Sequence, residues 1–87
     1  MVEIVYGNQF KKFAQNLPKL QKEKLALLLL ILNENPFDQR LHSKSLRGPL
    51  EGFFSFRITR DWRVIFQFID QNTIQLIVTM HRKDIYR

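Results

Sequence analysis

Two arginines face each other across a predicted β-hairpin near the middle of the chain. The residues up to Ile58 and from Trp62 onward alternate between apolar and polar types, and three residues separate the two runs. This spacing predicts a hairpin in which Ile58 is opposite Trp62. In the same register, Arg57 is opposite Arg63. Like charges in such a position repel each other, which lowers stability unless an anion binds between them. The pair therefore indicates an anion site, and a phosphate group is the natural candidate.

A histidine at the end of the next predicted strand is placed near this pair. The simplest register across the second turn sets Arg63 opposite Thr79, and the same register sets Asp61 opposite His81. Two guanidinium groups beside an imidazole can hold a phosphodiester and move a proton. Cleavage of RNA by attack of a 2′-hydroxyl on its own phosphate requires these groups and no metal.

Each of these side chains also has a structural interpretation. Arginines on the solvent face of a sheet are usually solvated, and a histidine at a strand end is more often a surface residue than a catalyst. Asp61 suits a turn, and Trp62 is expected in the core, although a tryptophan at a strand start also stacks on bases. A basic loop of His42, Lys44 and Arg47 is either solvated or in contact with phosphate.

The charge balance predicts an anionic partner. Fourteen Lys and Arg residues against eight Asp and Glu residues give a net charge of +6 and an isoelectric point near 10.1. Nucleic acid, an anionic membrane or an acidic protein would each match this charge. The chain has no glycine-rich phosphate loop and no G-x-S-x-G sequence, which excludes an ATPase, a dehydrogenase or a serine hydrolase.

The absence of cysteine excludes disulfides, thiolate catalysis and thiolate-bound zinc. The two histidines lack the spacing of a metal site, so neither a metal nor another cofactor is expected. The N-terminus has no signal sequence, and the apolar run from Leu25 to Leu32 is too short to span a membrane. These features predict a cytoplasmic protein that does not enter a membrane, and the apolar run is expected to be a buried helix segment.

The 87 residues are expected to form a single domain, 1–87, of the α+β class. We expect two N-terminal helices on one face of a small, mainly antiparallel sheet of about four strands. A loop from Phe37 to Glu51 would separate the helices from the last three strands. The first helix is marked by Phe10, Phe13, Ala14 and Leu17, the second runs from Lys19 to Asn33, and the strands are Val2 to Tyr6, Phe53 to Ile58, Trp62 to Ile69 and Thr73 to Met80.

Strict alternation assigns one face of this sheet to the core and leaves the other face mixed. The predicted core face consists of Phe54, Phe56, Ile58, Trp62, Val64, Phe66, Phe68, Ile74, Leu76, Val78 and Met80. The second helix is apolar around most of its circumference, so part of its surface should meet the first helix or a partner chain.

Three local patterns, in their order and spacing, resemble the RelE/ParE toxin superfamily of bacterial toxin–antitoxin systems. The patterns are Leu46-Arg47-Gly48, then Phe56-Arg57-Ile58 with Trp62-Arg63-Val64-Ile65-Phe66, and finally His81-Arg82-Lys83-Asp84-Ile85-Tyr86. The resemblance spans nearly the whole chain. It implies a compact toxin that enters the ribosomal A site and cuts mRNA, and that a cognate antitoxin holds inactive.

The resemblance also implies roles for individual residues. Arg63 would stabilise the transition-state phosphate with help from Arg57, and Tyr86 would stack on the nucleotide or act near it. Because the sequence mixes features of two branches, the resemblance does not settle the acid and the base; we assign proton transfer to His81, its orientation to Asp61, and a secondary acid role to Tyr86. The YafQ-like branch matches Asp61, Trp62 and His81, but this chain has Arg57 and Lys44 where that branch has histidines. The expected RNA contacts are Lys44, Arg47, Arg60, Trp62, Arg82 and Lys83.

The antitoxin is expected to be acidic and to dock an amphipathic helix on the second helix. The chain would then be a monomer alone and part of a hetero-oligomer with its antitoxin. The predicted contact residues are Leu25, Leu28, Leu29 and Leu32. Two alternatives remain open at this point: a ParE-like inhibitor of DNA gyrase that cuts no RNA, and a module that binds RNA without turnover.

Overall fold

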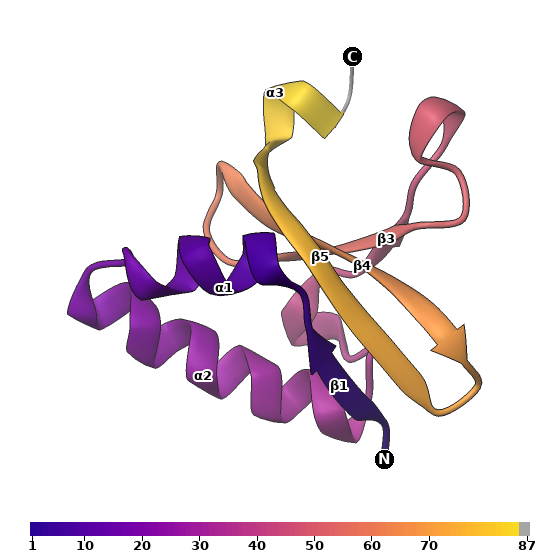
Figure 1. Cartoon of the computed structure of the whole chain (residues 1–87), viewed down its shortest axis with the longest axis horizontal. Helices are drawn as coiled ribbons and strands as arrows, with labels where there is room; N and C mark the ends of the chain where they lie inside the picture. Colours follow the sequence, from indigo (N-terminus) through magenta and orange to yellow (C-terminus); the bar gives the residue numbers. More distant parts are fainter. Residues whose placement is uncertain (86–87) are drawn as a thin grey trace.

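The computed structural model of the chain describes residues 1–85 and shows helices on one face of a sheet (Figure 1). The α-helices are α1 (Asn8–Gln15), α2 (Lys19–Glu34) and α3 (Arg82–Ile85), and the short 3-10 helices are η1 (Gln39–Leu41) and η2 (Gly48–Leu50). The strands are β1 (Glu3–Tyr6), β2 (Lys44–Ser45), β3 (Phe54–Arg57), β4 (Trp62–Asp70) and β5 (Thr73–His81). The predicted α+β class is confirmed.

The sheet has the order β1-β5-β4-β3-β2, in which β1 is parallel to β5 and the other neighbours are antiparallel. All four predicted strands are present. The fifth strand, β2, lies inside the segment that was expected to be a loop, where Lys44 pairs with Ser55 and Ser45 pairs with Phe54. Two polar residues are too short a run to show alternation, so the sequence gives no sign of this strand.

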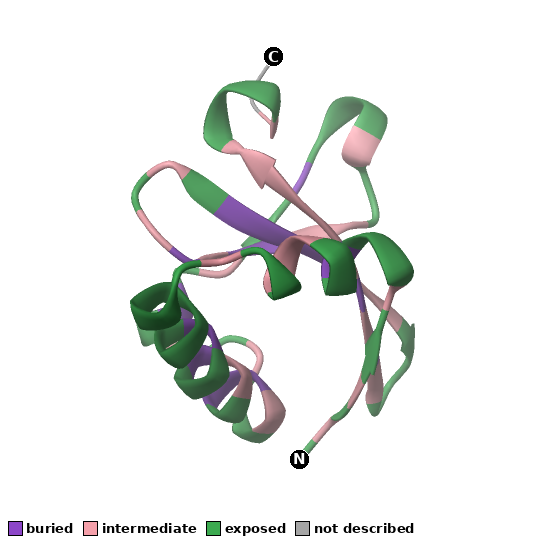
Figure 2. Cartoon of the chain, turned by 60° about the vertical axis from the view of Figure 1, so that its left-hand side comes forward, coloured by how far each residue is buried: buried purple, intermediate pink, exposed green. Residues whose placement is uncertain are grey.

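The core lies between the helices and one face of the sheet, where Figure 2 shows buried residues along the inner side of α2. Leu25, Leu28 and Leu32, three of the predicted antitoxin contacts, are buried in the chain alone, where they are only 4%, 7% and 0% exposed. Their spacing places them on the stripe of α2 that covers the sheet. Leu29 is only partly buried, and the exposed large apolar residues of this helix are Leu20, Leu27 and Leu30.

An irregularity in β5 changes the predicted register between β4 and β5. Phe66 pairs with Leu76 but Ile65 pairs with Val78, so Ile77 is a bulged residue without a directly opposite partner. A second irregularity lies between Phe68 and Asp70. Beyond a bulge, the side chains of a strand point to the opposite faces from those that simple alternation predicts. Ile77 and Val78, at this bulge, are both apolar, so the sequence does not reveal it.

The bulge corrects four expectations. Arg63 is opposite Met80 rather than Thr79, and His81 is opposite Trp62 rather than Asp61. Residues directly opposite each other share a face of the sheet. Met80 and Val78 therefore lie on the face of Arg63, and not on the core face as alternation predicts.

The turn after α2 is held by a local ion pair. The Asp38 carboxylate accepts hydrogen bonds from the Arg40 backbone N–H group (2.9 Å) and from the Arg40 side chain (2.9 and 3.0 Å). These hydrogen bonds lower the pKa of Asp38 to about 2, and the bonds from the Arg40 side chain contribute most. Asp38 thereby caps η1.

His42 follows η1 and has a left-handed backbone conformation, with φ of 51° and ψ of 44°. Glycine adopts this conformation without steric cost, whereas other residues lose about 1–2 kcal/mol there. We therefore expect His42→Gly to raise the free energy of unfolding by roughly 0.5 kcal/mol, after the larger chain entropy of unfolded glycine is counted. Urea unfolding measures this, with His42→Ala as the matched control. An equal gain in both variants would contradict the explanation.

Candidate functional site

The predicted arginine pair is confirmed at the tip of the β3–β4 hairpin. Arg57 is directly opposite Arg63, and the Ile58 N–H group donates to the Trp62 carbonyl oxygen at 3.0 Å. Within residues 1–85, neither guanidinium forms an ion pair with a carboxylate. The hairpin therefore holds two adjacent positive charges that the described residues do not neutralise.

Arg63 has a structural task in addition to its charge. Its side chain is only 6% exposed, and its Nη1 group donates to the carbonyl oxygens of Thr59 (2.9 Å), Arg60 (2.9 Å) and Trp62 (3.4 Å). These three carbonyls belong to the hairpin turn and to the first residue of β4. Arg63 therefore closes the turn and is itself fixed in place.

Arg57 is less constrained. It is half-buried, and its Nε atom is buried without a hydrogen-bonding partner among the described residues. The same is true of the Ser55 hydroxyl, which lies two residues earlier on β3. No feature of the sequence marks Ser55 as part of the site, because its burial depends on neighbours from β2 and β4.

The start of α3 is tied to the hairpin turn. The Arg82 N–H group donates to the Asp61 carbonyl oxygen at 2.8 Å, and the Arg82 Nε atom lies 3.4 Å from the Asp61 carboxylate. Asp61 therefore pairs with Arg82, and not with His81 as the sequence predicts. The ion pair is about half exposed, so it is worth at most about 1 kcal/mol, but it keeps a guanidinium beside the turn.

His81 packs against Trp62 and caps α3. The two rings meet edge to face with centroids 5.3 Å apart, and the Lys83 N–H group donates to the His81 Nδ1 atom at 3.2 Å. This hydrogen bond occupies Nδ1, so a substrate would exchange a proton with His81 at Nε2, without loss of the contact with α3.

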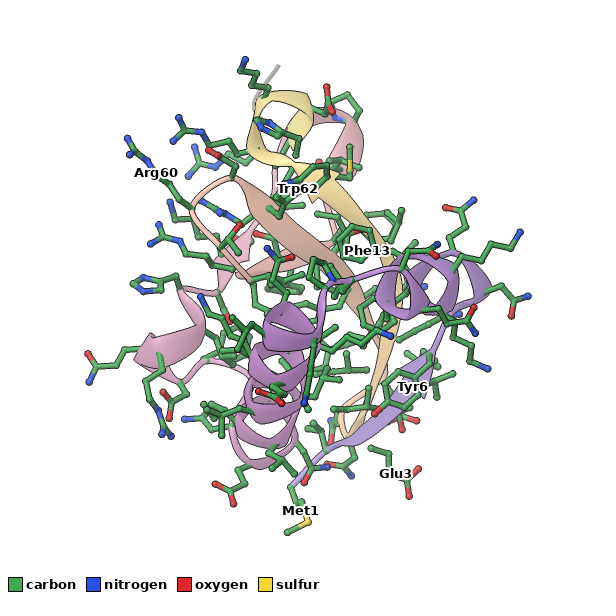
Figure 3. The ribbon with its side chains drawn as sticks, turned by 90° about the vertical axis from the view of Figure 1, so that its left-hand side faces the viewer. Met1, Glu3, Tyr6, Phe13, Arg60 and Trp62 are labelled. Carbon is green, nitrogen blue, oxygen red and sulfur yellow. The ribbon has the colours of Figure 1, made fainter. Side chains whose placement is uncertain are left out.

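Trp62 lies at the margin of the core. The residue is 40% exposed, in contrast to the expected core position, and the Phe13 ring of α1 packs on the indole with 6.0 Å between ring centroids. Figure 3 shows Trp62 at the same end of the molecule as Arg60, whose side chain extends outward from the turn. A flat aromatic surface therefore lies beside the cationic turn.

The structure thus gathers most of the predicted site at one end of the sheet, but on two faces. Arg57 and Arg63 lie on one face of β3–β4, whereas Trp62 and His81 lie on the face that carries the helices. The cationic residues Arg60, Arg82 and Lys83 lie around this end. Lys44 is opposite Ser55, on the arginine face, and Arg47 precedes η2. Tyr86 lies outside the described residues.

Comparisons with known proteins give matches by structure. No model of a known protein family matches the sequence, and no curated protein matches it. A YoeB/ParE toxin from Agrobacterium tumefaciens is 20% identical with a TM-score of 0.76, covering 93% of this chain and 99% of that chain. YafQ from Escherichia coli strain BL21(DE3) is 21% identical with a TM-score of 0.75, covering all of both chains. The chain has the RelE/ParE toxin fold.

A third structure with this fold comes from a complex. It belongs to the toxin–antitoxin complex RelBE2 from Mycobacterium tuberculosis, is 22% identical with a TM-score of 0.76, and covers 93% of this chain and 98% of that chain. Within residues 1–85, no group of three metal-ligating side chains comes together in this version of the RelE/ParE fold. None of the described helices is long and apolar enough to cross a bilayer.

Proposed function

We propose that this chain is the toxin of a type II toxin–antitoxin system and that it cleaves mRNA in the ribosomal A site. The reaction would be metal-independent attack of a ribose 2′-hydroxyl on the adjacent phosphate. The observation that carries the proposal is the pair of guanidinium groups of Arg57 and Arg63, which no described carboxylate neutralises. Fixed positive charges of this kind stabilise the negative charge that develops on a phosphate as the bond breaks. The RelE/ParE fold supports the same assignment.

Each residue of the site has a role in this proposal. Arg63 and Arg57 contact the scissile phosphate, and His81 transfers a proton through its Nε2 atom. Because His81 leaves β5 on the other face, the RNA bends around the strand ends so that one nucleotide reaches both groups. Asp61 positions Arg82, and Tyr86 stacks on the nucleotide or donates a second proton.

The surrounding cations extend the contact to the rest of the RNA. Phosphate groups of RNA attract exposed lysines and arginines without regard to sequence. The net charge of +6 strengthens this attraction. The proposed cationic contacts are Lys44, Arg47, Arg60, Arg82 and Lys83, and Trp62 adds an aromatic surface for stacking on a base.

The proposed partner is an acidic antitoxin. A mainly apolar groove beside α2 has a volume of about 440 Å³ and is lined by Ile4, Tyr6, Ala26, Leu29, Leu30 and Asn33. Leu29 is the part of the predicted contact set that remains accessible, and Leu30 is 67% exposed. An amphipathic acidic segment would cover these side chains. The similar chain from the toxin–antitoxin complex RelBE2 supports a protein partner of this kind.

Substitution of Arg57 tests the proposed reaction. Arg57→Ala is expected to lower the rate of mRNA cleavage by about 10²–10³-fold and to relieve growth arrest, since it removes one fixed charge from the phosphate site. Primer extension on mRNA from an in vitro translation reaction measures the cuts. Lys24→Ala on α2 is the matched control, because it also removes one positive charge but lies far along the chain from the hairpin. Equal cleavage by both variants would overturn the proposal.

One observation favours a ParE-like inhibitor of DNA gyrase instead. The register separates His81 from the arginine pair, and a gyrase inhibitor needs no assembled acid–base set. On the ribonuclease proposal His81→Ala abolishes the codon-positioned cuts. If uncut mRNA and gyrase-cleaved DNA accumulate with the unaltered chain, the ParE-like function is correct. If salt-sensitive RNA binding occurs with neither product, the chain is a binding module.

A further inference from the structure

Ser55 is a buried polar residue without a hydrogen-bonding partner. It is 1% exposed, and its Oγ atom bonds to no other described residue. Such groups are rare in folded proteins, since a buried hydroxyl that has lost water and gained nothing lowers stability. The hydroxyl therefore requires a partner that residues 1–85 do not supply.

A second unpaired donor lies next to it. Ser55 and Arg57 are two residues apart on β3, so they share one face with about 7 Å between their Cβ atoms. The Arg57 Nε atom is also buried and unpaired, and Arg57 is directly opposite Arg63. A hydroxyl and an Nε–H group can both donate, and the oxygens of a phosphodiester only accept. An oxyanion therefore satisfies both groups at once.

We propose that Ser55 donates a hydrogen bond to a phosphate oxygen of the bound RNA, alongside Arg57 and Arg63. Ser55 is then a binding residue of the cationic site and lies deeper in it than the two guanidinium groups. The identification of the anion as RNA rests on the proposed function, whereas the two unpaired donors by themselves require only an oxyanion.

The two donors are enclosed in the free chain, because the Ser55 Oγ and Arg57 Nε atoms are buried. Leu46 lies on the same face as Ser55, since its N–H group donates to the Phe53 carbonyl oxygen at 2.9 Å, and it is buried outside the main core. The chain beyond Leu46 runs through η2, which has no buried residue. The proposal requires a shift of this connection to admit the phosphate, and such a shift would expose no buried residue of η2.

The test measures binding without cleavage. The probe is a twelve-nucleotide RNA with 2′-O-methyl groups at every position, which has no 2′-hydroxyl to attack its phosphates. Ser55→Ala is expected to weaken binding of this probe about tenfold while the melting temperature stays the same or rises, because the variant also removes an unpaired buried hydroxyl. Ser55→Thr keeps the hydroxyl and is expected to bind more tightly than Ser55→Ala. Ser45→Ala is the matched control on the neighbouring strand and should change neither quantity.

Two results would overturn the inference. Unchanged affinity in Ser55→Ala would mean that the hydroxyl meets only water. Weaker binding together with a lower melting temperature would mean that Ser55 supports the fold and does not contact the anion. The proposed reaction is judged separately, since cleavage of mRNA by the unaltered chain in the in vitro translation reaction decides it. Weaker probe binding in Ser55→Ala without any cleavage by the unaltered chain would retain the anion site and reject the nuclease.

Discussion

Replacing Arg63 with methionine is expected to lower the free energy of unfolding by about 3 kcal/mol and to abolish RNA cleavage. The methionine side chain fills most of the same space but donates no hydrogen bond. The carbonyl oxygens of Thr59, Arg60 and Trp62 then lose the donor that now joins them. Thermal and urea unfolding measure the stability, and primer extension measures the cleavage. Because both properties fall together, lost toxicity in an Arg63 variant alone does not prove a catalytic role.

Arg57→Met separates the two effects. Arg57 donates no hydrogen bond from its buried Nε atom and is only half-buried, so we expect a change in stability within about 0.5 kcal/mol. The same charge is removed from the phosphate site, and cleavage should fall as it does in Arg57→Ala. If Arg63→Met were as stable as Arg57→Met, the three bonds to the turn would not be what holds the hairpin together.

The different roles of these two neighbouring arginines could be predicted only in part from the sequence. Alternation and the short turn are enough to place Arg57 opposite Arg63, because strand periodicity and hairpin length are local properties. They do not show that Arg63 turns its side chain back onto the hairpin carbonyls. That contact depends on the path of the turn itself, and three polar residues fit many turn geometries.

The position of His81 was less predictable for a different reason. One bulged residue, Ile77, moves every later side chain of β5 to the opposite face. Leu76, Ile77 and Val78 are all apolar, so the sequence shows no break in the apolar pattern at the point where the register changes. The predicted strand was present, but the predicted neighbours of the four residues after the bulge, 78–81, were wrong.

The apolar run of α2 shows how burial divides one helix. The sequence predicts correctly that this helix covers the sheet, but every leucine in it has the same hydropathy. Only the fold decides that Leu25, Leu28 and Leu32 face the core while Leu30 faces solvent. The apolar surface of α2 that is accessible to a partner therefore includes Leu30, and not the buried stripe of Leu25, Leu28 and Leu32.

Gly7→Ala is expected to cause the second large effect, at the junction of β1 and α1. A Cβ atom at this position would lie 2.5 Å from the carbonyl oxygen of Leu76, a backbone atom that cannot rotate away. The Gly7 N–H group donates to the same oxygen at 2.8 Å, and the adjacent Tyr6 pairs with Leu76. Any movement that relieves the clash therefore breaks the parallel pairing of β1 with β5.

The expected loss in Gly7→Ala is about 3 kcal/mol, which lowers the melting temperature by roughly 10–20 °C. The backbone angles of Gly7, φ of −69° and ψ of 156°, suit alanine well, so the loss comes from the contact and not from the conformation. Asn8→Ala, at the next residue, is the matched control and should shift stability by less than about 0.5 kcal/mol. Calorimetry on both variants decides the matter. A melting temperature of Gly7→Ala within a few degrees of the unaltered chain would show that β1 can move away from β5, and that its pairing with β5 contributes little to the fold.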